Sequence, residues 1–530
     1  MGGLVSKAKL VYRATVKLGE TYDLLKKRLE TPPGLPVENP TLPLWTVPAA
    51  RIPADPGPLP DSADIVIIGS GITGTSVAYN ALVRDPGLRI VMLEARDVCS
   101  GATGRNGGHI NPPLYHDYSE LKEVYGEHAA KVVIAFRRSH ITELQRVASV
   151  EDILKESQCR ETEHLDVFTC PKAFATAKDN LARWRAEMPS ESSTFISHER
   201  EEAIQKYHLS DQVVGCISNS GGAMHPYRFV TSLLSILLSR HPSDFRIFSH
   251  TPCTSITSAD GAYIVHTPNG SIRTTHVVHA TNGWSSELLR PLVAKIAPAR
   301  GMMSAQRPGT TLHASTLSGM RSFVFYRGSS GYDYLTQLPT GEHELMFGGG
   351  WAMACDDSQG LPEIGIADDS VVNHVGQSYL AGAVPQYFGM RNWGEDAKPS
   401  SERPGGEKLL WGEGRTKAQW SGILGISADM LPWVGRLPEK VAGRASPTSK
   451  ASEMREKAAK GKGATAAPGE WIAAGYTGEG MVHAWMSGKA LAHMVLDQED
   501  EIKDWFPDIL RVTEKRWKEA NMEKLFERFM

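Results

Sequence analysis

Three glycines, Gly69, Gly71 and Gly74, follow the spacing G-x-G-x-x-G. Such glycines allow a tight turn, close approach of the backbone to a pyrophosphate, and close packing of a helix on a strand. Glu94 follows the last of them by 20 residues, where a carboxylate can accept hydrogen bonds from ribose hydroxyls. The pattern predicts a dinucleotide-binding site.

The segments around these glycines have the patterns of the elements that would position them. Residues 65–68 are an apolar, mostly β-branched run, typical of a parallel strand buried on both faces. A helix is predicted over 75–82 and a second strand over 89–93. A G-x-G-x-x-G alone is often only a turn, but this βαβ context favours the dinucleotide interpretation.

A loop without bulky side chains follows the acidic residue. Residues 99–109 read CSGATGRNGGH and contain four glycines. Backbone N–H groups and small polar side chains of this kind suit a phosphate or the edge of a ring. We therefore expect the loop to contact the cofactor, with Arg105 as its anchor rather than as a substrate clamp.

Two later segments also place small residues after a strand. Residues 275–280 lead into Thr281–Gly283, and residues 471–474 lead into GYTGEGM and a helix predicted over 482–496. Ligands of open α/β sheets bind at the carboxyl ends of such strands. Between them, residues 322–326, 332–338 and 344–347 have the pattern of antiparallel strands.

The composition describes a globular protein and excludes several classes. With 530 residues the chain is long enough for two domains, and the net charge of −3 gives no electrostatic footprint for nucleic acid. The six cysteines and 18 histidines show no metal-ligand spacing, so we predict no metal site and a reducing, cytoplasmic location. No apolar run is long enough to span a membrane.

The first 60 residues are expected to be an extension with two parts. MGGLVS fits the acceptor pattern for N-myristoylation, and Lys7, Lys9, Arg13 and Lys17 follow it. An acyl chain with a basic helix would give a peripheral membrane contact, although an ordinary solvated or packed helix is the favoured interpretation. Residues 32–60 are a proline-rich strap, which we expect Trp45 to pin to the body.

Four motifs in order resemble the D-amino-acid-oxidase-like superfamily of FAD oxidoreductases. They are IVIIGSGITGTSVAYNAL with LEARD, CSGATGRNGGH, THVVHATNGW, and WSGILGISADMLPWVG with AAGYTGEGM. The sequence is most similar to the branch with glycine, sarcosine and γ-glutamylputrescine oxidases, and its leader resembles fungal members. The resemblance implies an α/β fold: a Rossmann-like FAD-binding domain, with a parallel sheet and helices, plus a smaller substrate domain with a mixed antiparallel sheet.

The resemblance also implies a domain organisation and a set of FAD contacts. The expected parts are an N-terminal extension and strap (1–60), a discontinuous FAD-binding domain (61–118, 222–292 and 406–500, with a mobile insertion at 440–468), a substrate domain (119–221 and 293–405) and a helical tail (501–530). The residues implied to contact FAD are Gly69, Gly71, Ile72, Thr73, Gly74, Glu94, Ala95, Arg96, Ser100, Gly101, Ala102, Thr103, Arg105, Asn106, Gly107, Gly108, Cys253, Thr281, Asn282, Gly283, Gly478, Glu479, Gly480 and Met481. A helix N-terminus at 480–483 is expected to stabilise negative charge near flavin N1.

Departures from the family pattern narrow the chemistry. Gly422 stands where several sarcosine oxidases have the cysteine that bonds to flavin. In other relatives a histidine makes this bond, and its place in the sequence is taken here by about Arg105, so FAD is expected to be non-covalent. Leu424 replaces the arginine that grips the substrate carboxylate in glycine oxidase. The lysines of sarcosine oxidase fall on Val482 and near Met346, which leaves open whether oxygen or an electron carrier is the acceptor.

The expected reaction is oxidation of a C–N bond of an amine or amino-acid-like substrate. Hydride passes to flavin N5 and the imine is then hydrolysed, so the protein has mainly to orient the substrate. Trp351 and Tyr334 are candidate walls of an aromatic cage, although each could be core. His109, Glu479 and His483 flank the flavin segments: Glu479 could pair with an amine or be a surface acid, and His483 is expected to be packed or capping.

Two alternatives stay open at this point. One is a flavin dehydrogenase or tailoring oxidase that acts on a secondary or cyclic amine and passes electrons to a carrier. The other is a flavoprotein that serves mainly as a membrane-associated assembly partner, with the N-terminal segment as its working part.

Overall fold

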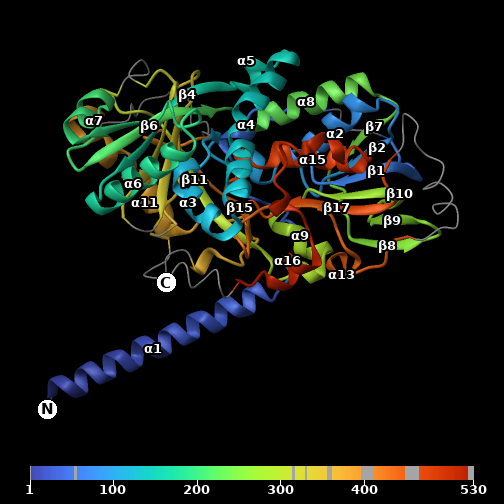
Figure 1. Ribbon diagram of the computed structural model, residues 1–530, viewed down its shortest axis with the longest axis horizontal. Coiled ribbons are helices and arrows are strands. Elements are labelled where there is room, and N and C mark those ends of the chain that lie inside the picture. The colour runs from blue at the N-terminus through green and yellow to red at the C-terminus, as the bar shows by residue number, and fades with distance from the viewer. Residues whose placement is uncertain are drawn as a thin grey trace.

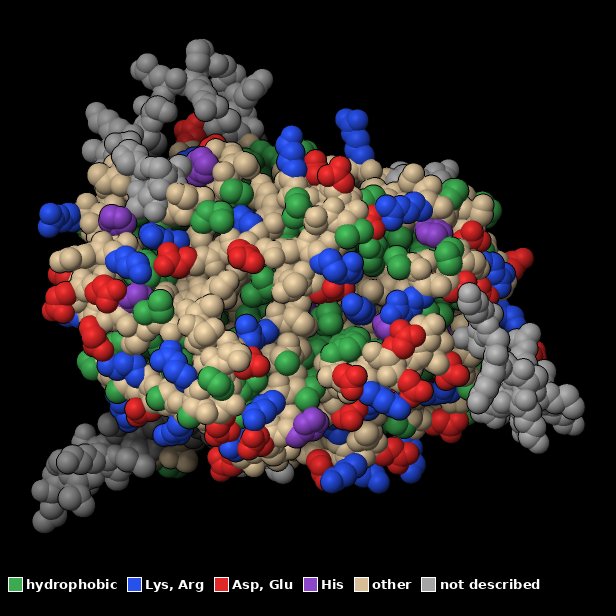
Figure 2. Space-filling model, turned by 45° about the horizontal axis from the view of Figure 1, so that its top comes forward, with side chains coloured by type: hydrophobic (Ala, Val, Ile, Leu, Met, Phe, Trp, Pro, Cys, Tyr) green, Lys and Arg blue, Asp and Glu red, His purple; other side chains and the backbone are tan. Residues whose placement is uncertain are grey.

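The structure is a computed structural model that describes residues 2–52, 57–312, 317–328, 331–351, 353–354, 361–394, 410–447 and 465–522. These residues form two sheets, which lie side by side with helices packed around them (Figure 1). Basic and acidic side chains are interspersed over the face drawn in Figure 2.

The first sheet is the α/β sheet that the glycine motif predicts. Within the described residues it has eight strands. Six of them lie in the order β16-β17-β10-β1-β2-β7, while β9 pairs with β10 and β8 pairs with β9. Its strands are β1 (Ser62–Ile68), β2 (Ile90–Leu93), β7 (Phe245–Phe248), β8 (Ser255–Ala259), β9 (Ala262–Thr267), β10 (Gly270–His279), β16 (Trp433–Arg436) and β17 (Gly469–Ala474). β17, β10, β1, β2 and β7 run parallel, which confirms the predicted strands at 65–68, 89–93 and 471–474.

The parallel register brings four loops to one edge of this sheet. The carboxyl ends of β1, β2, β10 and β17 lead into Gly69, Glu94, Ala280 and Gly475. Because parallel strands end on the same side, residues far apart in the sequence share one edge. That edge is where the candidate site is built.

The second sheet has nine described strands, in the order β15-β11-β14-β13-β12-β4-β6-β3, with β5 paired to β6. They are β3 (His109–Ile110), β4 (Arg160–Phe168), β5 (Ile196–Glu199), β6 (Gly215–Ala223), β11 (Ile296–Gln306), β12 (Arg321–Tyr326), β13 (Tyr332–Gln337), β14 (Leu345–Gly348) and β15 (Thr416–Ser427). The antiparallel pairs β12–β13 and β13–β14 confirm the strands predicted there.

Two segments differ from the expectation. The charged, amphipathic pattern of residues 119–210 predicts a helix-rich region, and helices are present there, yet β4 also pairs with β12 and β6 in the middle of the second sheet. Its polar side chains Glu161, Glu163 and His164 obscure the strand pattern. β15, within the range expected to belong to the FAD-binding domain, pairs with β11 of the second sheet. The domain boundaries themselves stay a prediction.

The longer helices cover both sheets. They are α2 (Ile72–Arg84), α3 (Leu114–Tyr125), α4 (Glu127–Val150), α6 (Pro171–Glu187), α7 (Arg200–Tyr207), α8 (Pro226–Arg240), α11 (His374–Phe388) and α15 (Ala484–Val495). Shorter ones are α5 (Leu154–Ser157), α9 (Ser285–Leu288), α12 (Met390–Trp393), α13 (Glu439–Ala442) and α16 (Glu514–Glu519). The helix predicted at 482–496 begins as an α-helix only at Ala484, because residues 480–482 form a 3₁₀ turn.

The N-terminal extension is a helix followed by a strap. The helix α1 (Gly2–Leu29) projects from the body, and its C-terminal end packs against the body at Leu25 and Leu29 (Figure 1). In the strap, Trp45 is 1% exposed and its Nε1 donates to the Asn106 carbonyl, 2.5 Å away. Trp45 therefore pins the strap as predicted. No helix among the described residues is long and apolar enough to cross a bilayer.

Two expectations fall partly outside the described residues. Residues 448–464 of the insertion expected at 440–468 are not described, and neither are residues 523–530 of the tail.

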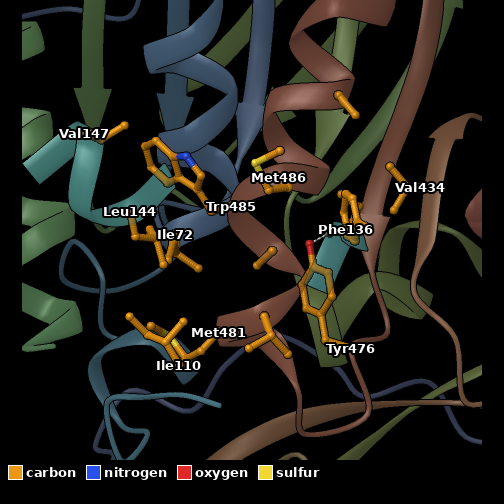
Figure 3. Close-up of a cluster of buried hydrophobic side chains, with 14 of the residues drawn as sticks. Ile72, Ile110, Phe136, Leu144, Val147, Val434, Tyr476, Met481, Trp485 and Met486 are labelled. Carbon is orange, nitrogen blue, oxygen red and sulfur yellow. Dashed lines mark hydrogen bonds between the residues drawn. The ribbon is translucent and has the colours of Figure 1, made fainter. Parts of the chain in front are cut away.

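The helices α2 and α15 cross at a glycine next to the main apolar core. Figure 3 shows Ile72 of α2 and Trp485 and Met486 of α15 in one cluster with Leu144 and Val147 of α4. A Cβ on Gly488 would lie 2.6 Å from Ser76 Cβ and 2.7 Å from the Thr73 carbonyl oxygen. The close crossing fixes the first turn of α2 against the loop that precedes α15.

Gly488→Ala should therefore destabilise the protein, although alanine is the better helix former. We expect the free energy of unfolding to fall by about 1–3 kcal/mol, the usual cost of overpacking, measured by chemical denaturation. Gly382→Ala is the matched control, since Gly382 lies in α11 with nothing within 4 Å of a new Cβ. That variant should gain up to about 1 kcal/mol, and equal effects at both sites would contradict the close crossing.

Candidate functional site

A single cavity of about 680 Å³ runs along the carboxyl edge of the first sheet and under the second sheet. Its wall includes the loops after β1, β2, β10 and β17 and side chains of β4, β11, β12, β13 and β15. It therefore brings together the segments that the sequence predicts to bind a dinucleotide and residues from the expected substrate sheet.

The loop between β1 and α2 forms a backbone cradle in this cavity. Gly69 has φ +109°, and a Cβ there would lie 2.6 Å from the Ala280 carbonyl oxygen. A Cβ on Gly71 would lie 3.0 Å from Thr103 Oγ1. The first turn of α2 has no acidic residue and no side-chain cap. Ile72 N–H donates to Thr103 Oγ1 at 3.0 Å. The rest of this helix N-terminus, behind bare backbone, fits the pyrophosphate of a dinucleotide.

Hydrogen bonds fix the carboxylate of Glu94, which follows the end of β2. One carboxylate oxygen accepts hydrogen bonds from Ser70 N and Ser70 Oγ, at 3.1 and 2.6 Å. The other accepts from the backbone N–H of Arg96 at 3.1 Å. The carboxylate is thus fixed in the cavity wall, in an orientation that fits the ribose of a dinucleotide.

A buried ion cluster holds the loop 99–109. Asp369 is fully buried and pairs with Arg96 at 2.9 Å and with Arg105 at 3.4 Å. Arg105 also donates from Nε to the Ser100 carbonyl at 2.7 Å and from a terminal nitrogen to the Ser421 carbonyl at 2.8 Å. Arg105 therefore ties its own loop to β15, which is an anchoring position.

The strap forms part of the wall near Arg96. Gly34, Leu35 and Pro36 line the cavity, and Gly34 N–H donates to Glu287 at 2.9 Å. The Arg96 guanidinium lies 5.7 Å from the centre of the Trp284 ring. The sequence indicated a pinned strap but gave no signal that it reaches the cavity.

Most of the residues predicted to contact FAD line the cavity. They are Gly69, Gly71, Ile72, Thr73, Glu94, Ala95, Arg96, Gly101, Ala102, Thr103, Arg105, Asn106, Gly107, Cys253, Thr281, Asn282, Gly478, Glu479, Gly480 and Met481.

Four of the predicted contacts, Gly74, Ser100, Gly108 and Gly283, lie behind the cavity wall. The three glycines are at close backbone approaches: a Cβ would meet the carbonyl oxygens of Gly69, Met224 and Leu424 at 2.0, 2.3 and 2.5 Å, respectively.

The candidate catalytic residues of the sequence analysis all line the cavity, but in different surroundings; they are His109, Tyr334, Trp351 and Glu479. Tyr334 packs between two glycines, and a Cβ on Gly107 would lie 2.8 Å from its ring. His109 meets Tyr334 edge-on at 5.2 Å, and burial lowers the pKa of His109 to about 3, so its ring is neutral at physiological pH. Trp351 instead donates from Nε1 to the Arg300 carbonyl and packs against the cluster around Leu25.

Glu479 belongs to a charged cluster that the sequence did not indicate. Arg137 of α4 lies 2.7 Å from Asp117 of α3 and 3.5 Å from Glu479. Its Nε donates to His483 Nε2 at 3.1 Å. Burial raises the pKa of the Asp117 and Glu479 carboxyl groups, although the positive charge of Arg137 acts in the opposite direction and lowers it. Burial also opposes the charge on Arg137, but the two carboxylates outweigh it and raise the pKa of the guanidinium.

A row of aromatic rings continues from Tyr334 past this cluster. Tyr332 lies 6.4 Å from Tyr334 and 6.0 Å from Tyr326, which lies 5.0 Å from His116. Tyr332 and His116 were missed because neither belongs to a motif. Only the succession of Tyr326, Tyr332 and Tyr334 on two adjacent strands could have signalled the wall.

The positions that differ from the resembled family also lie at the cavity. Gly422 and Leu424 line it, and a Cβ on Gly422 would lie 3.0 Å from Arg105 Cβ. The space beside Gly422 is therefore occupied by the anchoring arginine. Among the described residues, no group of three or more His, Cys, Asp or Glu side chains could hold a metal ion.

Gly71→Val should yield protein that purifies without flavin, because branched methyl groups would fill the space in front of the first turn of α2. The measurement is the ratio of flavin absorbance to protein absorbance, with circular dichroism to check folding. Gly87→Ala, in the exposed turn before β2, is the control and should keep its flavin. A Gly71→Val protein that is folded and yellow would contradict the cradle.

Comparisons with known proteins agree with this geometry. The family model described as FAD dependent oxidoreductase (DAO) matches residues 64–494. Gamma-glutamylputrescine oxidoreductase of Escherichia coli (strain K12) is 23% identical over 297 residues, which cover 54% of this chain and 65% of that protein. The match thus spans less than two thirds of that relative.

Solved structures with the same fold include two amino-acid enzymes. Glycine oxidase from Geobacillus kaustophilus has a TM-score of 0.60 at 15% identity, covering 86% of this chain and 99% of the other. L-Proline dehydrogenase from P. horikoshii has a TM-score of 0.60 at 16% identity, covering 88% and 100%.

The family match extends from β1 into α15 and so includes the loops after β1, β2, β10 and β17 that line the cavity. The chain belongs to the DAO family of FAD-dependent oxidoreductases.

Proposed function

We propose that this FAD-dependent oxidoreductase oxidises a C–N bond in an amine or amino-acid-like substrate. The observation that carries the proposal is the continuity of the cavity. One space joins the backbone cradle at Gly69 and Gly71 to a chamber with the Tyr326, Tyr332 and Tyr334 rings on its wall. A substrate in that chamber would share the cavity with the cofactor, which direct transfer of hydride requires.

The residues of the cradle would hold FAD without a covalent bond. The first turn of α2 would bind the pyrophosphate, and Glu94 the ribose of the adenosine. Ala95, Arg96 and Cys253 would border the adenine. Residues 101–107 and 478–481 would flank the flavin. Gly422 and Arg105 stand at the two positions where the resembled family has its flavin-linking cysteine or histidine, so neither of these links can form. Bound FAD would supply, at its N5 atom, the acceptor for a hydride.

The protein's part in the reaction is orientation and exclusion of water. The substrate carbon next to nitrogen loses its hydrogen with two electrons, so its nitrogen must be unprotonated and must donate its lone pair. Water then adds to the resulting imine and releases a carbonyl compound together with ammonia, from a primary amine, or an amine, from a secondary one. His109, neutral because of its low pKa, and the Tyr334 ring would fix the substrate beside the flavin loop without adding charge.

The proposal predicts that at least one amine or amino acid reduces the bound flavin. Anaerobic stopped-flow mixing of the purified holoenzyme with primary, secondary and acyl-polyamine amines and amino acids should bleach the flavin absorbance. Hydrogen peroxide on reoxidation would identify an oxidase, and its absence a dehydrogenase that uses a carrier. If the whole panel leaves the flavin oxidised, the amine oxidoreductase proposal fails.

A peripheral membrane contact through α1 is a second, independent proposal. The segment 2–29 has seven Lys and Arg residues and two acidic ones. The exposed fractions of Tyr12, Val16 and Leu24 are 71%, 40% and 63%. Basic and apolar side chains on one projecting helix suit an anionic lipid surface. N-Myristoylation of Gly2 stays a prediction, which the mass of the native protein tests.

The double variant Arg13→Glu with Lys17→Glu tests the contact by sedimentation with vesicles of phosphatidylserine and phosphatidylcholine. Binding should fall several-fold, since each basic residue near such a surface is worth about 1 kcal/mol. The control, Lys172→Glu with Arg183→Glu, makes the same charge change on α6 of the body. Equal binding of both variants to the vesicles would rule out a role for α1.

A further inference from the structure

The wall of the cavity is acidic. Five carboxylates line it, against the guanidinium groups of Arg96 and Arg105, which are its only Arg or Lys side chains among the described residues. The carboxylates are those of Glu94, Asp117, Asp166, Glu287 and Glu479. An anionic substrate group has few places to bind there.

Both arginines are already engaged in ion pairs within the protein. Both pair with Asp369, which is fully buried, and Arg105 also donates to the carbonyls of Ser100 and Ser421. Turning Arg105 toward a ligand would break its contact with Asp369, which would keep only Arg96, and would leave the Ser100 and Ser421 carbonyls without their charged donor. Breaking a buried, hydrogen-bonded ion pair is destabilising.

Negative charge, which would attract a substrate ammonium, is present in the chamber. Asp117 and Glu479 share the single guanidinium of Arg137, so the three side chains carry a net charge of −1 when ionised. Arg137 has 4% of its side chain exposed, whereas Asp117 and Glu479 have 37% and 28% and line the cavity. The carboxylates therefore face the chamber, with the arginine behind them.

Aromatic rings face the same space. Tyr332 is 48% exposed on the cavity wall, and its ring lies 6.0 Å from that of Tyr326. The faces of such rings attract ammonium groups and do not attract carboxylates. The charge and the rings favour the same kind of ligand.

We propose that Asp117 and Glu479 are specificity-determining residues that select amines without a carboxylate on the carbon that bears the nitrogen. A substrate ammonium balances the charge of Asp117, Glu479 and Arg137 on entry, and its proton then passes to one of the two carboxylates, which leaves the nitrogen lone pair available for the oxidation. An α-amino acid brings a third carboxylate next to the two existing ones, and that repulsion excludes it. This assignment rests on the proposed function, because it concerns the same chamber.

The test uses two ligands that differ only in the carboxylate and cannot be oxidised. tert-Butylamine and 2-aminoisobutyric acid have no hydrogen on the carbon that bears nitrogen, so neither can donate a hydride. Their Kd values are measured from the change in flavin absorbance of the holoenzyme. We expect tert-butylamine to bind at least about tenfold more tightly, equivalent to a difference of about 1.4 kcal/mol.

Two variants connect this preference to the carboxylates. Glu479→Gln and Asp117→Asn keep the size of each side chain and remove its charge. Each variant should raise the Kd of tert-butylamine at least about tenfold. Glu123→Gln, on the exposed side of α3, should leave the Kd unchanged. Flavin content and circular dichroism show whether each variant is folded, and the second carboxylate variant serves if the first is not.

Tighter binding of 2-aminoisobutyric acid would overturn the inference, and so would Kd values within twofold of wild type in both carboxylate variants. These results are distinct from failure of the proposed function, since neither ligand can reduce flavin. A reduction panel that fails while tert-butylamine binds through Glu479 would refute the oxidation and leave the selectivity in place.

Discussion

The fully buried carboxylate of Asp369, between Arg96 and Arg105, is the interaction on which the site depends. A buried charge is tolerated only when it is paired and hydrogen-bonded, so the three side chains constrain each other. Through them the loop after β2, the loop 99–109 and the segment before α11 are fixed together. The strap joins the same cluster, because Thr41 donates from its N–H and its hydroxyl to the Asp369 carbonyl.

This arrangement determines the electrostatic character of the whole cavity. Because both lining arginines are committed to Asp369 and to backbone carbonyls, they stabilise loops instead of presenting positive charge to a ligand. The remaining guanidinium nearby, that of Arg137, lies behind two carboxylates. The charge on this part of the cavity wall is set by Asp117 and Arg137, which lie outside the four shared motifs, and by Glu479, which lies within AAGYTGEGM.

Local patterns predicted what depends on local sequence. The βαβ unit around Gly69, the strands of the β12–β14 meander and the lining role of most of loop 99–109 follow from spacing and apolar runs. The cluster of Asp117, Arg137 and Glu479 could not be read, because three different elements supply it and their meeting depends on how α3 and α4 pack. β4 was missed because its polar side chains hide a strand in the middle of a sheet. The start of α15 was placed too early, since residues 480–482 form a 3₁₀ turn.

The strap at the Arg96 end has a thermodynamic consequence. Gly34–Pro36 form part of the cavity wall but have no strand or helix of their own, and Gly34 is attached through one hydrogen bond to Glu287. A dinucleotide that contacts these residues binds best when the strap is docked, so occupancy and docking are linked equilibria. If docking of the strap raises the affinity for the cofactor by some factor, bound cofactor raises the equilibrium constant for docking of the strap by the same factor. The apoprotein and the holoprotein should accordingly differ in the order of a segment that precedes the first strand of the fold.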